Sequence, residues 1–250
     1  MQGRTVVEKS TQPKVRLLAV VPARGGSKRL PRKNIMLLGG RPLISWTIDA
    51  ALESDVCTDV LVSTDDNEIA AVARSAGALV PWLRPAELAT DTASSASVIA
   101  HALDWYEQEH GEVDAVLLLQ PTSPFRSIEA IRGAVCAYVN QTGVTRHPVV
   151  SVSPAASHPV WTFAWHDGEF SPSLGWEPLT LRSQDLPPAY ALNGALYVIP
   201  AVDARATLPV VRPGIVPFVM TDARESLDID TPDDWALASY LADVTGINVR

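Results

Sequence analysis

The stretch VRLLAVVPARGGSKRLPRKN, residues 15–34, decides the fold because it joins a buried strand to a glycine-containing basic loop. Its first part, residues 15–22, is a nearly continuous apolar run with several β-branched side chains. Such runs are typical of parallel strands that are covered on both faces. The loop, residues 23–34, follows the carboxyl end of this strand, where open α/β sheets bind their ligands.

Outward from this stretch, helical and strand patterns alternate. Helical spacing of apolar residues is found in residues 41–53, 66–77, 92–110 and 127–140, and strand-like runs in residues 60–64 and 115–120. Strands separated by helices of this length indicate βαβ units. The sequence therefore predicts an α/β fold in which a mostly parallel sheet is flanked by helices.

The rhythm breaks near residue 148. Residues 147–188 hold seven of the prolines and three of the seven tryptophans. Within them, residues 160–170 predict a hairpin that turns at Asp167-Gly168. We interpret residues 148–190 as an excursion from the sheet rather than a second domain. Further strands are expected at residues 193–199 and 216–220, and a last helix is expected to open with a capping box at Thr231–Asp234.

The composition and net charge of the chain limit the classes of function that it could have. The chain has 250 residues, 47% of them hydrophobic, and a net charge of −8. These values predict one domain over residues 15–250, with residues 1–14 as a disordered tail that lacks the apolar core of a secretory signal. No apolar run reaches the length of a membrane span, and the acidic balance disfavours nucleic-acid binding. Neither a membrane nor a nucleic acid is expected as a partner.

Only two cysteines, Cys57 and Cys136, are present. Two such distant residues form neither a disulfide framework nor a zinc-ligand pattern. We expect both to be buried free thiols in a reducing compartment, which agrees with a cytoplasmic location.

The basic loop predicts an anionic ligand. It carries five cations around Gly25-Gly26, which are Arg24, Lys28, Arg29, Arg32 and Lys33. In an acidic protein, such a cluster at a strand end favours a polyphosphate. The loop matches neither GxGxxG nor GxxxxGK[ST], so dinucleotide binding and Walker-type ATP hydrolysis are disfavoured.

Carboxylates supply a second candidate feature. If residues 228–230 are extended, Asp228 and Asp230 share one face with Ile229 buried opposite, an arrangement suited to a divalent metal. Alternatively, acidic residues before a helix merely complement its dipole. Asp65 follows the second strand, where a turn role and a functional role are equally open.

The loop at residues 23–34 resembles the signature loop of the acylneuraminate cytidylyltransferases, with Arg29 where a glycine is usual. Segments similar to the family's other motifs follow in order at residues 83–95, 119–124, 193–197 and 226–231. The resemblance implies a Rossmann-like nucleotidyltransferase fold. It also implies that the excursion at residues 148–190 forms a homodimer.

The resemblance further implies a set of site residues. Nucleotide-binding residues would be Ala23, Arg24, Ser27, Lys28, Lys33, Asn34, Arg84, Ala93 and Ser95. Catalytic residues would be Arg24, Lys28, Asp228 and Asp230, with Asp228 and Asp230 also holding Mg²⁺. Acceptor-binding residues would be Gln120, Arg182, Tyr190, Asn193 and Tyr197.

The activity implied is the transfer of CMP from CTP to a nonulosonic, sialic-acid-like sugar acid, with Mg²⁺-assisted in-line attack on the α-phosphate. Two positions depart from the family, because Ala191 and Ser183 stand where arginines that could bind the sugar carboxylate are usual. An eight-carbon keto acid or a phosphonate therefore remains an alternative small anionic acceptor. A non-catalytic nucleotide-binding module is the alternative of another class, which the presence of both aspartates disfavours.

Overall fold

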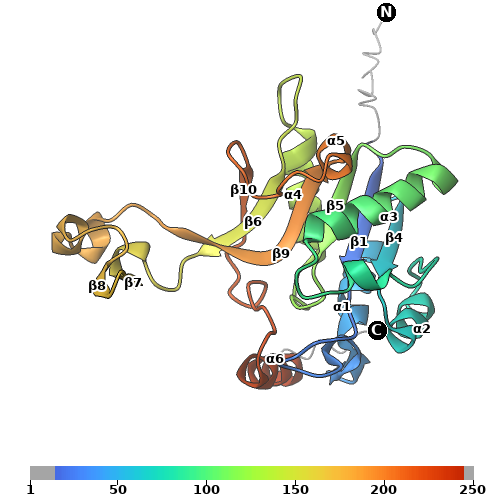
Figure 1. The fold of residues 1–250 in the computed structure, drawn as a ribbon, viewed down its shortest axis with the longest axis horizontal. Coiled ribbons are helices and arrows are strands. Elements are labelled where there is room, and N and C mark those ends of the chain that lie inside the picture. Colours follow the sequence, from blue (N-terminus) through green and yellow to red (C-terminus); the bar gives the residue numbers. More distant parts are fainter. Residues whose placement is uncertain (1–14, 245–250) are drawn as a thin grey trace, which may run out of the picture.

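Six strands form one sheet, in the order β10-β6-β9-β5-β1-β4, in the computed structural model, which describes residues 15–244 (Figure 1). The strands are β1 (Leu17–Pro22), β4 (Asp59–Ser63), β5 (Ala115–Leu119), β6 (Val149–Pro154), β9 (Tyr190–Pro200) and β10 (Val216–Val219). β9 runs antiparallel to β5 and β6, whereas the pairs β1–β4, β1–β5 and β6–β10 are parallel. The predicted mostly parallel α/β sheet is confirmed. The predicted tail, residues 1–14, lies outside the described residues.

Helices cover both faces of the sheet. They are α1 (Leu43–Glu53), α2 (Asn67–Ser75), α3 (Ser95–His110), α4 (Ile128–Val139), α5 (Ala201–Arg205) and α6 (Pro232–Val244). In β1, Leu17, Ala19 and Val21 pack in the core that α1, α2 and α4 cover. Leu18 and Val20 face α3 and α5 on the other side. Alternate residues thus point to opposite faces of the sheet, and both faces are buried. For this reason nearly every residue of the strand is apolar. Within residues 15–244, no helix has the length and apolar character required to cross a membrane.

Polar caps fix the helix starts. The side chains of Asp66, Ser94 and Ser127 accept hydrogen bonds from first-turn N–H groups at 2.7 to 3.1 Å, so α2, α3 and α4 begin one residue after each cap. At α6, Thr231 N donates to Asp234 Oδ2 at 2.8 Å and Asp234 N donates to Thr231 Oγ1 at 3.3 Å. This reciprocal pair is the capping box that the sequence predicted.

A small third core joins the basic loop to the C-terminal helix. Its members are Leu30, Leu38, Leu43, Trp46, Ile229, Ala238 and Ala242. Leu38 belongs to the short hairpin of β2 (Leu37–Leu38) and β3 (Arg41–Pro42). Short 3₁₀ helices occupy η1 (Lys33–Ile35), η2 (Ala86–Leu88), η3 (Pro159–Trp161), η4 (Glu177–Thr180) and η5 (Ser183–Asp185). The third core therefore places the basic loop next to residues 228–230.

The excursion is shorter than predicted. Residues 149–154 form β6 of the main sheet, so the boundary expected at residue 148 moves to residue 155. The arm, residues 155–189, projects away from the sheet (Figure 1) and contains the hairpin of β7 (Phe163–His166) and β8 (Glu169–Pro172). Its turn lies at Asp167 and Gly168, both with positive φ, as predicted. Because Pro154 pairs with Tyr190, the two ends of the arm are neighbours in the sheet.

The two cysteines differ from each other. Cys136 is exposed on α4, so its predicted burial is wrong, and Cys57 is partly buried in the segment between α1 and β4. Cys136 lies on the same face of α4 as the exposed Glu129 and Arg132, so its helical spacing from these charged residues already indicated the solvent side.

Burial raises the pKa of the Cys57 thiol to about 12. Because the thiolate is the reactive form, iodoacetamide at pH 8 should alkylate Cys136 in the native protein and Cys57 only after unfolding. Peptide mass spectrometry of samples taken over time measures this order, with Cys136→Ser as the control. Equal rates at the two thiols in the folded protein would contradict the burial of Cys57.

Candidate active site

A cleft of about 480 Å³ lies at the carboxyl ends of β1, β4 and β5. Its walls come from the basic loop, from residues 84–98, from residues 120–122 and from Asp230. Five cationic side chains line it against two carboxylates; these are Arg24, Lys28, Arg29, Lys33 and Arg84 against Asp91 and Asp230. In a protein of net charge −8, this cleft is suited to a polyanion.

Backbone contacts set the shape of the basic loop. Gly25 N donates to Asp65 Oδ1 at 2.9 Å, and the Asn34 amide donates to Arg24 O at 3.0 Å. A Cβ on Gly25 would lie 2.8 Å from Asp66 Oδ2, so only glycine fits this close approach. Of the two roles left open for Asp65, its contact with Gly25 supports the structural one.

Asp91 bridges two loop cations. Its two carboxylate oxygens lie 2.6 Å from Arg24 Nη1 and 2.5 Å from Lys28 Nζ. Hydrogen bonds from Lys28 and Arg24 hold the pKa of Asp91 below its usual range. The carboxylate thus occupies a position between cations where a phosphate would also be stable. Asp91 is not among the residues predicted from the sequence, although it lies in the segment 83–95 that resembles a family motif.

Asp230 also lies between two cations. Lys33 is buried, and its Nζ lies 2.9 Å from Asp230 Oδ1 while donating to Ile229 O at 2.6 Å. Arg29 Nη1 lies 3.2 Å from Asp230 Oδ2. Arg29, which replaces the glycine usual in the family, therefore contacts the carboxylate predicted to bind a metal.

Asp228 is close enough to Asp230 for the two charges to interact, but unlike Asp230 it is not among the residues that line the cleft. Ile229 is fully buried between them, and its N–H donates to Thr122 O at 2.8 Å, as expected if both carboxylates face away from the core. The pKa of Asp228 is raised, mainly because neighbouring groups remove water from its carboxyl and further because Asp230 adds like charge. Among residues 15–244, no cluster of three or more His, Cys, Asp or Glu side chains could hold a metal. A metal here would need further ligands from a bound nucleotide.

Eight of the nine predicted nucleotide-binding residues line the cleft. Ala23 is the exception, because it is buried and its N–H donates to Ser63 O at 2.9 Å. Ala93 and Ser95 lie at the start of α3. Arg84 is buried at the end of β4, where its Nε donates to Ser63 Oγ at 3.0 Å, and burial lowers its pKa.

The predicted acceptor residues are less closely grouped. Gln120 lines the cleft, and its Oε1 would lie 3.5 Å from a Cβ on Gly194. Tyr197 is buried in the core beneath α3, and burial raises its pKa. Arg182 lies in the arm and Tyr190 at its base, both exposed. The acceptor roles of these residues stay predictions.

Asn193 fills a bulge in β9. Its Oδ1 accepts from Ser151 Oγ at 2.6 Å and from Ala195 N at 3.1 Å, and its Nδ2 donates to Ser153 Oγ at 2.8 Å. The next residue, Gly194, has φ +72°, a value that bulges of this kind assign to glycine. The Asn193 amide is therefore engaged by the sheet in this structure, and its acceptor role stays a prediction.

Solved structures of CTP-dependent nucleotidyltransferases share this fold. A CMP:2-keto-3-deoxy-manno-octonic acid synthetase, solved in complex with CTP, gives a TM-score of 0.67 at 18% identity, over 94% of this chain and 100% of that one. A 4-diphosphocytidyl-2C-methyl-D-erythritol synthase of Anaerococcus prevotii gives 0.64 at 14% identity, over 92% and 99%. The fold is thus that of the Rossmann-like nucleotidyltransferases.

Sequence relatives show to which family of nucleotidyltransferases the chain belongs. A family model described as cytidylyltransferase matches residues 18–241. The chain is 43% identical to a CMP-N,N'-diacetyllegionaminic acid synthase of Legionella pneumophila, over 92% of this chain and 97% of that protein. It is 36% identical to an N-acylneuraminate cytidylyltransferase of Escherichia coli, over 90% of this chain and 52% of that protein. A pseudaminic acid cytidylyltransferase of Campylobacter jejuni is 33% identical, over 72% and 76%. The chain belongs to the acylneuraminate cytidylyltransferase family, which makes it a nucleotidyltransferase and confirms the resemblance seen in its motifs.

Proposed function

We propose that this enzyme transfers CMP from CTP to a sialic-acid-like sugar acid of the legionaminic type and releases pyrophosphate. One observation carries the proposal. The basic loop, Arg84 and Asp230 converge on a single cleft, and Gln120 lies on its wall. This arrangement offers one side of the cleft to a triphosphate and the other to a polyhydroxylated acceptor.

The reaction needs charge stabilisation more than covalent help. An acceptor hydroxyl gives up its proton to solvent and attacks the α-phosphorus in line, the bond from that phosphorus to the bridging oxygen breaks, and pyrophosphate leaves with the electron pair of that bond. Arg24, Lys28 and Lys33 would bind the triphosphate and stabilise charge on the phosphoryl and leaving oxygens. The cleft would also hold the acceptor hydroxyl in line with the breaking bond, and this positioning lowers the barrier in addition to the charge stabilisation.

Mg²⁺ is the metal we propose for Asp228 and Asp230. Their hard oxygen donors fit this ion, which usually takes one or two carboxylates together with phosphate oxygens. Asp230 already draws Arg29 and Lys33 toward it, so the position favours positive charge. The ion would act as a Lewis acid on the phosphate oxygens.

The choice of acceptor rests on the sequence relatives. The legionaminic acid relative matches over 97% of its length at 43% identity, against 33% to 36% for relatives acting on other nine-carbon acids. Ala191 and Ser183, where arginines are usual in the family, support an acceptor other than sialic acid itself.

Pyrophosphate release with CTP and Mg²⁺ tests the proposal. The acceptor panel comprises N,N'-diacetyllegionaminic, N-acetylneuraminic and pseudaminic acids, an eight-carbon keto acid and a simple phosphonate. We expect the highest kcat/KM with the legionaminic acid and no release without an acceptor. Turnover of only the keto acid or the phosphonate would contradict the acceptor, and CTP binding without any turnover would indicate a non-catalytic module.

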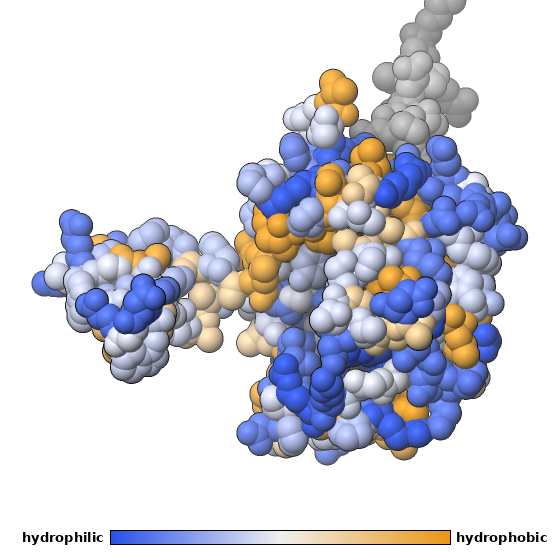
Figure 2. Space-filling model, viewed as in Figure 1, coloured by the Kyte–Doolittle hydropathy of each residue, from blue (hydrophilic) through white to orange (hydrophobic). Residues whose placement is uncertain are grey.

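A homodimer formed through the arm is the second part of the proposal. The arm projects as a separate lobe (Figure 2) and exposes Trp161, Phe163, Trp165 and Trp176. Aromatic residues are enriched at protein interfaces, so a second copy of the chain is the occupant we propose. Arg182, carried by this projecting segment, would then reach the acceptor in the partner's cleft.

Excision of the arm tests the dimer. Because Pro154 and Tyr190 are paired, a short glycine-rich link can replace residues 156–188 without disturbing β6 and β9. Light scattering should give twice the chain mass for the whole protein and a single chain mass for the shortened one. A monomeric whole protein would contradict the proposal.

A cytoplasmic location stays a prediction from the sequence.

A further inference from the structure

Arg126 is a buried cation that the proposed chemistry does not use. It follows β5 in the segment before α4 and is 3% exposed. Its Nε donates to Ala195 O at 2.7 Å and its Nη2 donates to Gln120 O at 2.8 Å, while its buried Nη1 has no hydrogen-bond partner. The guanidinium therefore links the end of β5 to the bulged part of β9.

One of the two linked positions lies on the wall of the cleft, because Gln120, directly after β5, lines it. Gln120 is the residue whose carbonyl Arg126 holds, and its side chain lies against Gly194. Ala195, the other carbonyl, directly follows Gly194. A change in the separation of these two carbonyls would move the Gln120 amide relative to the cleft.

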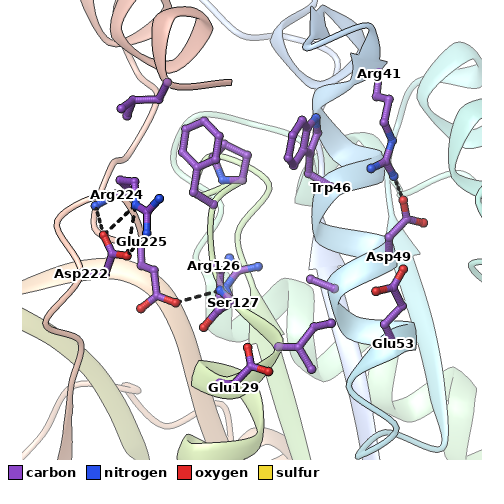
Figure 3. Close-up of a pocket in the computed structure, with 15 residues that line it drawn as sticks. Arg41, Trp46, Asp49, Glu53, Arg126, Ser127, Glu129, Asp222, Arg224 and Glu225 are labelled. Carbon is purple, nitrogen blue, oxygen red and sulfur yellow. Dashed lines mark hydrogen bonds and ion pairs between the residues drawn. The ribbon is translucent and has the colours of Figure 1, made fainter. Parts of the chain in front are cut away.

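Glu225 connects Arg126 to the carboxylate segment. It is the acidic side chain whose charge acts on Arg126, and its Oε1 accepts from Ser127 N at 3.0 Å. Figure 3 shows Arg126, Ser127 and Glu225 together beside a second pocket, with Glu225 on the chain that leads to residues 228–230. Burial lowers the pKa of Arg126 to about 9, which reflects the cost of keeping this charge away from water.

Stability alone does not account for an arginine here. Burying a charge is costly, and within residues 15–244 no salt bridge to Arg126 offsets that cost, since Glu225 acts on it only through its charge. The orphaned Nη1 adds to this cost. What arginine provides is a rigid fork that reaches two carbonyls at once, which a lysine ammonium does not reproduce.

We propose that Arg126 is a positioning residue that sets the acceptor wall of the cleft and, through Glu225, aligns it with Asp228 and Asp230. The inference rests on the proposed transfer to a sugar acid. Since a misplacement of about 1 Å can cost roughly a hundredfold in rate, the exact separation of Gln120 and Ala195 matters for the acceptor. CTP binding, which uses the basic loop, does not depend on it.

Arg126→Lys and Arg126→Met test the inference, with kcat and KM measured separately for acceptor and for CTP. We expect kcat/KM for the acceptor to fall about a hundredfold in both variants, while the Kd for CTP stays near wild type. The melting temperature should fall, most in Arg126→Met, because two buried carbonyls lose their donor, so the rates are measured well below it. Arg132→Lys is the matched control. Arg132 also donates to two carbonyls, Ser54 O at 2.9 Å and Glu53 O at 3.2 Å, but lies on α4 outside the cleft.

Glu225→Gln is a second test variant, in which the side chain still offers an oxygen that can accept from Ser127 N. It should lower kcat/KM for the acceptor in the same direction as Arg126→Lys. Unchanged acceptor kinetics in the Arg126 variants would overturn the inference, as would losses for CTP and acceptor in proportion to a lower melting temperature. If the wild-type enzyme turns over no sugar acid, the proposed function fails, and the positioning role fails with it.

Discussion

Asp230→Asn should reduce turnover by at least about a thousandfold while leaving the fold intact. The substitution keeps the size of the side chain and removes the charge that faces Lys33 and Arg29. Without that charge, the position no longer favours a cation next to the phosphates. Pyrophosphate release at saturating CTP measures the loss, and the melting temperature reports on folding.

Asp233→Asn is the control for this variant. Asp233 is an exposed carboxylate in the first turn of α6, three residues further along the chain and outside the cleft. It should retain wild-type turnover. Near wild-type activity of Asp230→Asn would show that this carboxylate has no part in the reaction.

Lys28→Ala should cost about 2 to 4 kcal/mol of transition-state stabilisation, or roughly thirty- to a thousandfold in kcat/KM for CTP. Lys28 is largely exposed and contacts Asp91, so its removal leaves the core undisturbed. The loss should be partly recovered in Lys28→Arg, which keeps the charge. Initial rates at varied CTP measure both variants.

Asp91→Asn should act in the opposite direction. Asp91 competes with phosphate for Arg24 and Lys28, so its neutralisation should tighten CTP binding by about two- to fivefold, the scale of an exposed ion pair. Titration calorimetry measures the Kd. Weaker CTP binding in this variant would mean that Asp91 holds the loop in its binding shape rather than competing with the nucleotide.

Local patterns predicted the parts of the fold that depend on local physics. The apolar run of β1, the N-cap at Ser94 and the capping box at Thr231 each follow from the backbone needs of a few neighbouring residues. β6 was missed because residues 149–154 lie among prolines. They become a strand only by pairing with β9 and β10, which lie far along the chain.

The residues of the candidate site likewise fall into those that local sequence predicts and those that depend on distant partners. The cations of the basic loop were predicted because one short segment carries them all. Asp91 and Arg126 were not, since their roles depend on partners distant in sequence, such as Lys28 and Ala195. Asn193 was predicted as an acceptor contact from its place in a family-like motif, and that role stays a prediction. The sequence did not show that the bulge at Gly194 turns its amide toward Ser151 and Ser153.

The central place of β9 has a consequence for synthesis of the chain. β5 pairs on one side with β1 and on the other with β9, whose residues emerge about eighty positions later. Until then, β5 is the open edge of a three-stranded sheet and consists of five apolar residues that end up fully covered. Such an edge is a template for association with other chains. A nascent or truncated chain that stops before residue 190 should therefore depend on a chaperone and aggregate without one.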